Sequence, residues 1–146
     1  MSKRILWLDN DLAQLQPFVE ALEDENYSVK TVESLSEAET YLQEAKFDLM
    51  IIDAMIPTLN SNEEMRYQPT ETDLGYKTGL VFYQHNRDIL QKAGTGVIVM
   101  TVRLDKAIKD EFIKAGLPGD AFATKYEMAE PVKFLNKVRN TIESQH

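Results

Sequence analysis

A short apolar run, Phe47–Ile52, constrains the fold more than any other segment of this chain. It is too short for a buried helix, and Lys46 and Pro57 bound it. Such a run is typical of a strand covered on both faces, as in a parallel sheet. A carboxylate, Asp53, follows it, and open α/β folds bind ligands at the carboxyl ends of their strands. An isolated Asp there is more often a turn cap, so its role depends on the rest of the chain.

The rest of the chain alternates between strand and helix patterns. Such alternation is typical of a parallel sheet with helices on both sides, and nothing suggests a second domain. We therefore expect residues 1–146 to form one α/β domain. The predicted strands are Ile5–Leu8, Ser28–Val32, Phe47–Ile52, Gly96–Thr101 and Ala121–Lys125, and the predicted helices cover 12–22, 34–45, 79–93, 104–115 and 128–144.

Local signals refine the helices. Ser34 and Glu37 have the spacing of a capping box, and Asn26 can take the left-handed position that ends a helix. Pro17 should either kink the first helix or restart it. The last helix is expected to bury one apolar face, formed by Met128, Val132, Leu135, Val138 and Ile142.

Composition excludes several classes of protein. The 146 residues include no cysteine, so neither a disulfide scaffold nor thiol chemistry is possible. The net charge of −8 argues against direct nucleic-acid binding through a broad electrostatic footprint. No apolar run has the length of a membrane span, and the first residues are not a signal peptide. We expect an acidic cytoplasmic protein without membrane insertion.

Residues 58–77 interrupt the alternation with a polar stretch. Connections between strands and helices usually have about two to six residues, so this insert calls for an explanation. A lid over the site, a partner-binding insert and a plain solvated loop are all open. A partly ordered, solvated loop is favoured because some apolar side chains could pack, namely Met65, Tyr67, Leu74 and Tyr76.

Four polar residues end four of the predicted strands: Asp9, Asp53, Thr101 and Lys125. In a parallel sheet these positions share one edge. Clustered carboxylates repel one another unless a hard cation joins them, and oxygen ligands suit Mg²⁺. A lysine and a hydroxyl beside the metal suit a phosphoryl group, because the ammonium neutralises its oxygens and the hydroxyl donates to one.

With these residues in place, the chain resembles the receiver domains of two-component response regulators. The resemblance covers nearly the whole sequence except the insert. It implies the flavodoxin-like three-layer α/β/α fold, with a five-stranded parallel sheet in the order 2-1-3-4-5. The segments that carry it are Leu8–Asp11, Asp53–Pro57, Thr78–Leu80, Met100–Thr101 and Lys125.

The resemblance also implies a mechanism. Asp53 would accept a phosphoryl group from a sensor histidine kinase or a phosphotransfer protein, and the domain would then control a downstream protein effector. Lys125 would pair with the phosphoryl group or with Asp53, and Thr101 would follow the phosphoryl group as the switch. Such a domain catalyses its own phosphorylation and dephosphorylation without being a conventional turnover enzyme. The implied Mg²⁺ ligands are Asp9, Asn10, Asp53 and the backbone carbonyl of Met55.

Three residues depart from the family pattern. Asn10 stands where a second carboxylate is usual, so weaker Mg²⁺ binding is expected. Tyr126 stands where a proline with a cis bond is usual; a cis bond before a non-proline residue costs about 3 kcal/mol, so we expect a trans bond. Phe122 takes the place of the usual switch tyrosine and lacks its hydroxyl.

Three functional readings follow. The first is a phosphorylated stand-alone receiver, and the second is a receiver-like interaction module that works without phosphate. The third, a phosphohydrolase of the haloacid dehalogenase type, is set aside because Met55 stands where that chemistry needs an aspartate. His85 is expected to be exposed. Arg103 could reach a phosphoryl group or lie on the surface.

Overall fold

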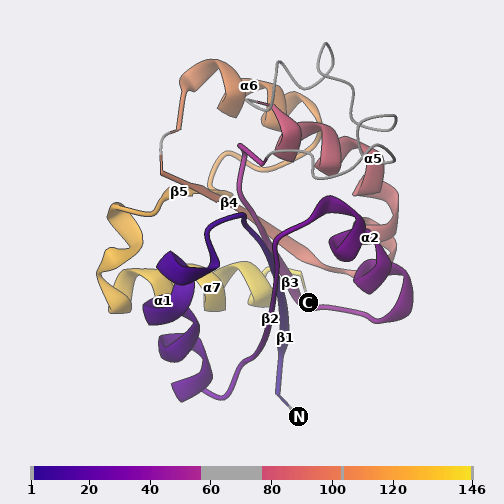
Figure 1. The fold of residues 1–146 in the computed structure, drawn as a ribbon. Coiled ribbons are helices and arrows are strands. Elements are labelled where there is room, and N and C mark those ends of the chain that lie inside the picture. Colours follow the sequence, from indigo (N-terminus) through magenta and orange to yellow (C-terminus); the bar gives the residue numbers. More distant parts are fainter. Residues whose placement is uncertain (1, 57–76, 103, 146) are drawn as a thin grey trace.

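The computed structural model describes residues 2–56, 77–102 and 104–145. Within them, five parallel strands form one sheet in the order β2-β1-β3-β4-β5 (Figure 1). The strands are β1 (Arg4–Leu8), β2 (Ser28–Val32), β3 (Leu49–Ile52), β4 (Gly96–Thr101) and β5 (Phe122–Thr124). The helices are α1 (Leu12–Asp24), α2 (Leu35–Glu44), α5 (Thr78–Ala93), α6 (Lys106–Lys114), the 3₁₀ helix η1 (Glu127–Ala129) and α7 (Pro131–Glu143). The predicted flavodoxin-like α/β/α architecture is confirmed.

Helices cover both faces of the sheet (Figure 1). On one face, side chains such as Leu6 and Met50 pack with residues of α2, α5 and α6. On the other, Trp7 and Ile51 pack with residues of α1 and α7. All four residues of β3 are buried, because this central strand has helices above and below it. The apolar run Phe47–Ile52 therefore supplies the central strand of the sheet.

Two of the three local helix signals are confirmed. The Ser34 hydroxyl oxygen accepts a bond from the Glu37 N–H at 3.1 Å, and the hydroxyl donates to the Glu37 carboxylate at 3.2 Å. Asn26 has a φ of 67°, in the left-handed region. Pro17 lies on an exposed part of one continuous helix from Leu12 to Asp24, so of the two predicted alternatives the restart at Pro17 is excluded and the kink stays a prediction.

The prediction of one continuous helix over residues 128–144 is wrong. Pro131 begins α7, and the residue before it, Glu130, is extended at φ −80° and ψ 113°. A residue that precedes proline is disfavoured in the helical region, so Glu130 separates η1 from α7. Starting the helix at Pro131 also turns Phe134 inward, while Val132 is 64% exposed. Val132 is thus no part of the buried face.

Two predictions fall partly or wholly outside the described residues: positions 58–76 of the insert, and Arg103. Lys77, at the end of the insert, is described, and its ammonium lies 3.1 Å from the Glu111 carboxylate on α6. His85 is exposed on α5, as expected. No helix in the described ranges is long and apolar enough to cross a membrane.

Candidate functional site

The carboxyl ends of β1 and β3 place two aspartates side by side. The register pairs Leu8 with Ile52, the residues that precede Asp9 and Asp53. The Asp53 N–H donates to the Leu8 carbonyl at 3.0 Å, so the ladder continues to the point where Asp53 begins the loop. Asp9 is fully buried and Asp53 is 5% exposed. Adjacent strands therefore deliver two buried carboxylates to one edge of the sheet.

Lys125 brings a cation to these carboxylates from the far edge of the sheet. Its backbone N–H donates to the Thr101 carbonyl at 2.9 Å, which extends the β4–β5 pairing by one residue. Its Nζ atom lies 2.6 Å from Asp9 Oδ2 and 3.7 Å from Asp53 Oδ2. The side chain is only 10% exposed. One buried ammonium thus contacts both aspartates.

Both aspartates use their two oxygens in the same way. One oxygen turns the backbone: Asp9 Oδ1 accepts from the Asp11 N–H at 2.9 Å, and Asp53 Oδ1 accepts from the Met55 N–H at 3.1 Å. The other oxygen of each faces Lys125. The turns hold the carboxylates in place, so the second oxygens point at a common position.

Thr101 closes the site from β4. Its side chain is buried, and its hydroxyl lacks a well-formed hydrogen bond with any other described residue. The hydroxyl nevertheless lies close enough to Asp53 to favour the ionised form of that carboxyl group. The structure therefore brings together Asp9, Asp53, Thr101 and Lys125, as their positions at the strand ends predicted.

Burial raises the pKa of Asp53 above its ordinary value, and the neighbouring Asp9 carboxylate raises it further. The Met55 N–H, the Lys125 ammonium and the Thr101 hydroxyl lower it and only partly offset the first two effects. The ionised carboxylate is therefore under-stabilised in the folded protein. Such a group gains from any further cation that reaches it.

The other predicted metal ligands lie at the surface. Asn10 is exposed beside Asp9, and the Met55 side chain is 36% exposed, although only its backbone carbonyl was expected to bind. The described ranges contain no group of three His, Cys, Asp or Glu side chains arranged around a metal position. Asp9 Oδ2 is buried and has the Lys125 ion pair but no hydrogen bond. Two buried carboxylates with amide and carbonyl oxygens beside them fit a hard divalent ion in their chemistry.

Two further residues support the site. The Gly79 N–H donates to the Ala54 carbonyl at 2.9 Å, and a Cβ atom at Gly79 would lie 2.2 Å from the Asp53 carbonyl oxygen. The family resemblance had singled out Thr78–Leu80, but the sequence alone did not show that a side chain at Gly79 would clash with the Asp53 backbone. Glu127 accepts from the Thr124 N–H at 3.2 Å and from its hydroxyl at 3.0 Å, which braces the loop after Lys125. The Thr-x-x-Glu spacing was a signal that could have identified this cap.

The structure also describes Tyr126 and Phe122, two residues that depart from the family pattern. The bond before Tyr126 is trans, as expected, and the Tyr126 side chain is 90% exposed. Phe122 is buried against Phe112, with ring centroids 5.9 Å apart. Trp7, two residues before Asp9 on β1, packs between Phe18 and Phe134, with centroids 5.9 and 5.7 Å away.

Several solved structures share this architecture over the whole chain. A CheY-like response regulator receiver domain from Methanospirillum hungatei JF-1 has a TM-score of 0.73 and 21% identity, and covers 99% of this chain and 97% of its own. The signal receiver domain of an HD domain-containing protein from Pseudomonas fluorescens Pf-5 has a TM-score of 0.74 and 19% identity, covering 100% and 98%. Chemotaxis protein CheY4 of Vibrio cholerae has a TM-score of 0.73 and 20% identity, covering 97% and 99%.

Sequence comparison finds shorter matches. Alginate biosynthesis transcriptional regulatory protein AlgB of Pseudomonas putida is 50% identical over 50 residues, which are 34% of this chain and 11% of AlgB. AlgB of Pseudomonas aeruginosa is 48% identical over a segment of the same length. The chain thus matches about a tenth of these curated relatives. No protein-family model matches it. The fold of this chain is that of the CheY-like receiver domains of response regulators.

Proposed function

We propose that this chain is a phosphoryl-accepting signalling domain in which Asp53 takes a phosphoryl group from the phosphohistidine of a kinase or phosphotransfer protein. The contact of one buried ammonium, Lys125, with both Asp9 and Asp53 supports this proposal most directly. A nucleophilic carboxylate, a fixed cation and an under-bonded hydroxyl on Thr101 are the groups that phosphoryl transfer needs at one point.

The proposed step is a displacement at phosphorus. An Asp53 carboxylate oxygen forms the new P–O bond while the P–N bond of the phosphohistidine breaks. The bonding electron pair returns to the imidazole, which then takes a proton. Lys125 neutralises the phosphoryl oxygens, and the Thr101 hydroxyl donates to one of them. Asp53 Oδ2, the oxygen that faces Lys125, is free of the turn that holds Oδ1.

The same site would hold Mg²⁺ through Asp9, Asp53, Asn10 and the backbone carbonyl of Met55. When bound, the ion would neutralise the charge that develops on the transferred group. Asn10 supplies an oxygen without a negative charge, so we expect weaker binding than a carboxylate would give there. Lys125 would have to release Asp9 in part, because its ammonium now lies 2.6 Å from Asp9 Oδ2.

Phosphorylation would act on partners through the ends of β4 and β5. A phosphoryl group on Asp53 would attract the Thr101 hydroxyl, and Phe122 lies on the neighbouring strand. We infer that this rearrangement controls the binding of a downstream protein effector in the cytoplasm. The domain would modify itself and would not turn over a diffusible substrate.

Acetyl phosphate with Mg²⁺, followed by intact mass measurement, tests the proposal. Wild type should gain one phosphoryl group and Asp53→Asn should gain none. Asp48→Asn is the matched control: Asp48 lies at the opposite end of the same strand and is tied to the Arg4 backbone, so this variant should be modified like wild type. Phosphorylation of Asp53→Asn would contradict the assignment.

One observation favours a second function, an interaction module that works without phosphate. The Lys125 ammonium lies closer to Asp9 than to Asp53, and Asn10 reduces the negative charge, so the site is partly balanced without a metal. This alternative requires that wild type stay unmodified at saturating acetyl phosphate and Mg²⁺ and that Asp53→Asn retain partner binding.

A further inference from the structure

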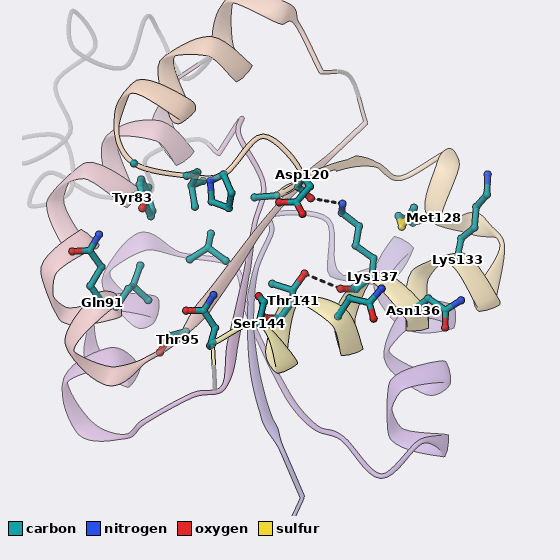
Figure 2. A pocket seen from close by; sticks show the side chains of 18 residues that line it. Tyr83, Gln91, Thr95, Asp120, Met128, Lys133, Asn136, Lys137, Thr141 and Ser144 are labelled. Atoms are coloured by element: carbon teal, nitrogen blue, oxygen red, sulfur yellow. Dashed lines mark hydrogen bonds between the residues drawn. The ribbon is translucent and has the colours of Figure 1, made fainter.

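A cavity of about 610 Å³ lies beside the sheet, away from the Asp53 site. Its walls include Thr95 and Val97 at the start of β4, whereas the proposed phosphorylation site lies where β4 ends. Side chains of α5, such as Gln91, and of α7, such as Asn136, line its two sides (Figure 2). The cavity is therefore a groove along the edge of the sheet, between the two helical layers.

Within the described ranges, the groove contains a strand edge that no other strand pairs with. β5 pairs only with Val99–Thr101 of β4, and the Val99 N–H donates to the Ala121 carbonyl at 2.7 Å. Backbone groups two residues apart in a strand point to the same side, so those of Val97 also face this edge. The Ala121 N–H instead turns back to the Pro118 carbonyl at 3.1 Å. No backbone hydrogen bond from the described residues reaches Val97 on this side.

The lining of the groove suits an acidic polypeptide. Amide side chains that can donate to and accept from a peptide backbone come from both walls, Gln91 from α5 and Asn140 from α7. The charged lining residues are Lys133, Lys137 and Asp120, a positive balance in a chain whose net charge is −8. The Lys137 ammonium already donates to the Asp120 carbonyl at 2.6 Å at the rim of the groove (Figure 2).

The environment of Lys137 supports this reading. Burial lowers its pKa, and nearby Lys109 lowers it further, while Asp120 and Glu127 act in the opposite direction. A carboxylate entering the groove would compensate the cost of burying this ammonium.

We propose that the groove binds an extended acidic segment of another protein, which adds to the sheet as a strand alongside Val97. Exposed strand edges with unpaired N–H and C=O groups accept such segments by main-chain hydrogen bonding. The backbone of Val97 would set the position of the incoming strand, and Lys133 and Lys137 would select its acidic side chains. This binding is independent of Asp53 and of its phosphorylation.

A short synthetic peptide, acetyl-Glu-Val-Thr-Val-Glu-amide, is the probe. Titrated into the full isotope-labelled chain, it should shift the Val97 amide resonance and slow the hydrogen exchange of that amide, while the Asp53 amide stays unchanged. The same peptide with N-methylated alternate backbone nitrogens keeps its side chains but cannot pair along an edge. It should bind about tenfold more weakly or not at all.

Variants test each part of the groove. Val97→Pro removes the backbone N–H that the proposal uses, which takes no part in the ladder, and also loses the buried valine side chain, whereas Val97→Ala loses that side chain but keeps the N–H. Val97→Pro should lose peptide binding and Val97→Ala should keep most of it. Lys137→Gln should bind the peptide about three- to tenfold more weakly. Lys92→Gln, on α5 outside the groove, should change nothing.

The N-methylated peptide keeps the test decisive even if Val97→Pro does not fold, because it is used with the wild-type chain. Equal binding of the two peptides would overturn the proposal, since strand pairing would then contribute nothing. Displacement of the peptide by millimolar acetate would show a simple anion site and would also overturn it. So would a concentration-dependent dimer in sedimentation experiments whose formation protects the Val97 amide, because the occupant would then be a second copy.

Discussion

The two ends of the β-sheet contain the same kinds of polar residue, but these residues are fully bonded at one end and incompletely bonded at the other. At the amino ends of the strands, each of three buried or half-buried groups has a partner. Asp48 Oδ2 accepts from the Arg4 N–H at 2.7 Å, and the Thr95 hydroxyl donates to the Phe47 carbonyl at 2.7 Å. The Asp48 carbonyl accepts from the Gly96 N–H at 3.0 Å.

At the carboxyl ends, the corresponding groups are incompletely bonded. Within the described residues the Thr101 hydroxyl is buried without a hydrogen bond, Asp9 Oδ2 has only its ion pair with Lys125, and burial raises the pKa of Asp53. Buried polar groups without partners cost stability. The amino ends therefore show polar groups that stabilise the fold, and the carboxyl ends show polar groups whose bonding capacity is incompletely used within the described residues. Four pairs of variants, one member at each end, test this difference.

The largest effect is expected from glycine. Gly79→Ala would place its Cβ 2.2 Å from the Asp53 carbonyl oxygen and 2.8 Å from the Ala54 Cα, which are backbone atoms that cannot move aside. We expect a loss of about 4 kcal/mol or more in the free energy of unfolding. At the other end, the Cβ of Gly96→Ala would lie 3.1 Å from Thr141 Cγ2, a side-chain atom that can shift, and 3.2 Å from the Thr141 carbonyl oxygen, contacts less close than those at Gly79, and the substitution should cost about 1–2 kcal/mol. Chemical denaturation measures both, and equal losses would contradict the close packing of the site loop.

Removal of a cation should have the next largest effect. Lys125→Met leaves two buried carboxylates without their ammonium, and breaking a buried ion pair costs about 3 kcal/mol. Lys3→Met removes a partner of Asp48 that is 4.0 Å away and half exposed, so the expected loss is below about 1 kcal/mol. The comparison fails if Lys125→Met unfolds at the same denaturant concentration as Lys3→Met.

Two threonines test hydrogen bonding with the same substitution. Thr95→Val leaves the Phe47 carbonyl without its donor and should destabilise the protein by about 1–2 kcal/mol. Thr101→Val removes a buried hydroxyl that has no well-formed bond and should change stability by less than about 0.5 kcal/mol, or raise it. A Thr101→Val variant as unstable as Thr95→Val would show that Thr101 is structurally bonded after all.

The smallest effect concerns pH. The folded-state pKa of Asp53 is raised, so the unfolded chain releases this proton first as the pH rises. Stability is lost between the ordinary pKa of an aspartate and the raised value in the folded state, and stays constant above that window. Asp53→Asn carries no such loss. In the absence of divalent ions its thermal midpoint should therefore exceed that of wild type by a few degrees at neutral pH, and the difference should vanish in strong acid.

Asp48→Asn is the control for this measurement. Asp48 is bonded to the Arg4 N–H, so its substitution should lower the midpoint slightly and should not reproduce the gain of Asp53→Asn. A lower midpoint for Asp53→Asn at neutral pH would mean that the Asp53 carboxylate stabilises the fold and that the two ends of the sheet do not differ.

Sequence patterns predicted most of the architecture, because they depend on local chemistry. Three correct predictions depended only on neighbouring residues in the sequence: the apolar run before Asp53, the cap at Ser34 and the left-handed Asn26. The last helix was misjudged, because the conformational effect of Pro131 on Glu130 outweighed the periodicity of apolar residues around it. For Pro17 the sequence left a kink and a restart open, and the structure excludes the restart because α1 continues through Pro17.

The sequence by itself determined which residues end each strand, and hence that Asp9, Asp53, Thr101 and Lys125 share one edge of the sheet. Only the tertiary structure decided that Lys125 lies closer to Asp9 than to Asp53, and that Gly79 must leave room for the Asp53 carbonyl. These distances depend on how strands and helices far apart in the chain pack together. Local sequence specifies the order and type of elements, whereas the spacing between their side chains follows from burial of the whole core.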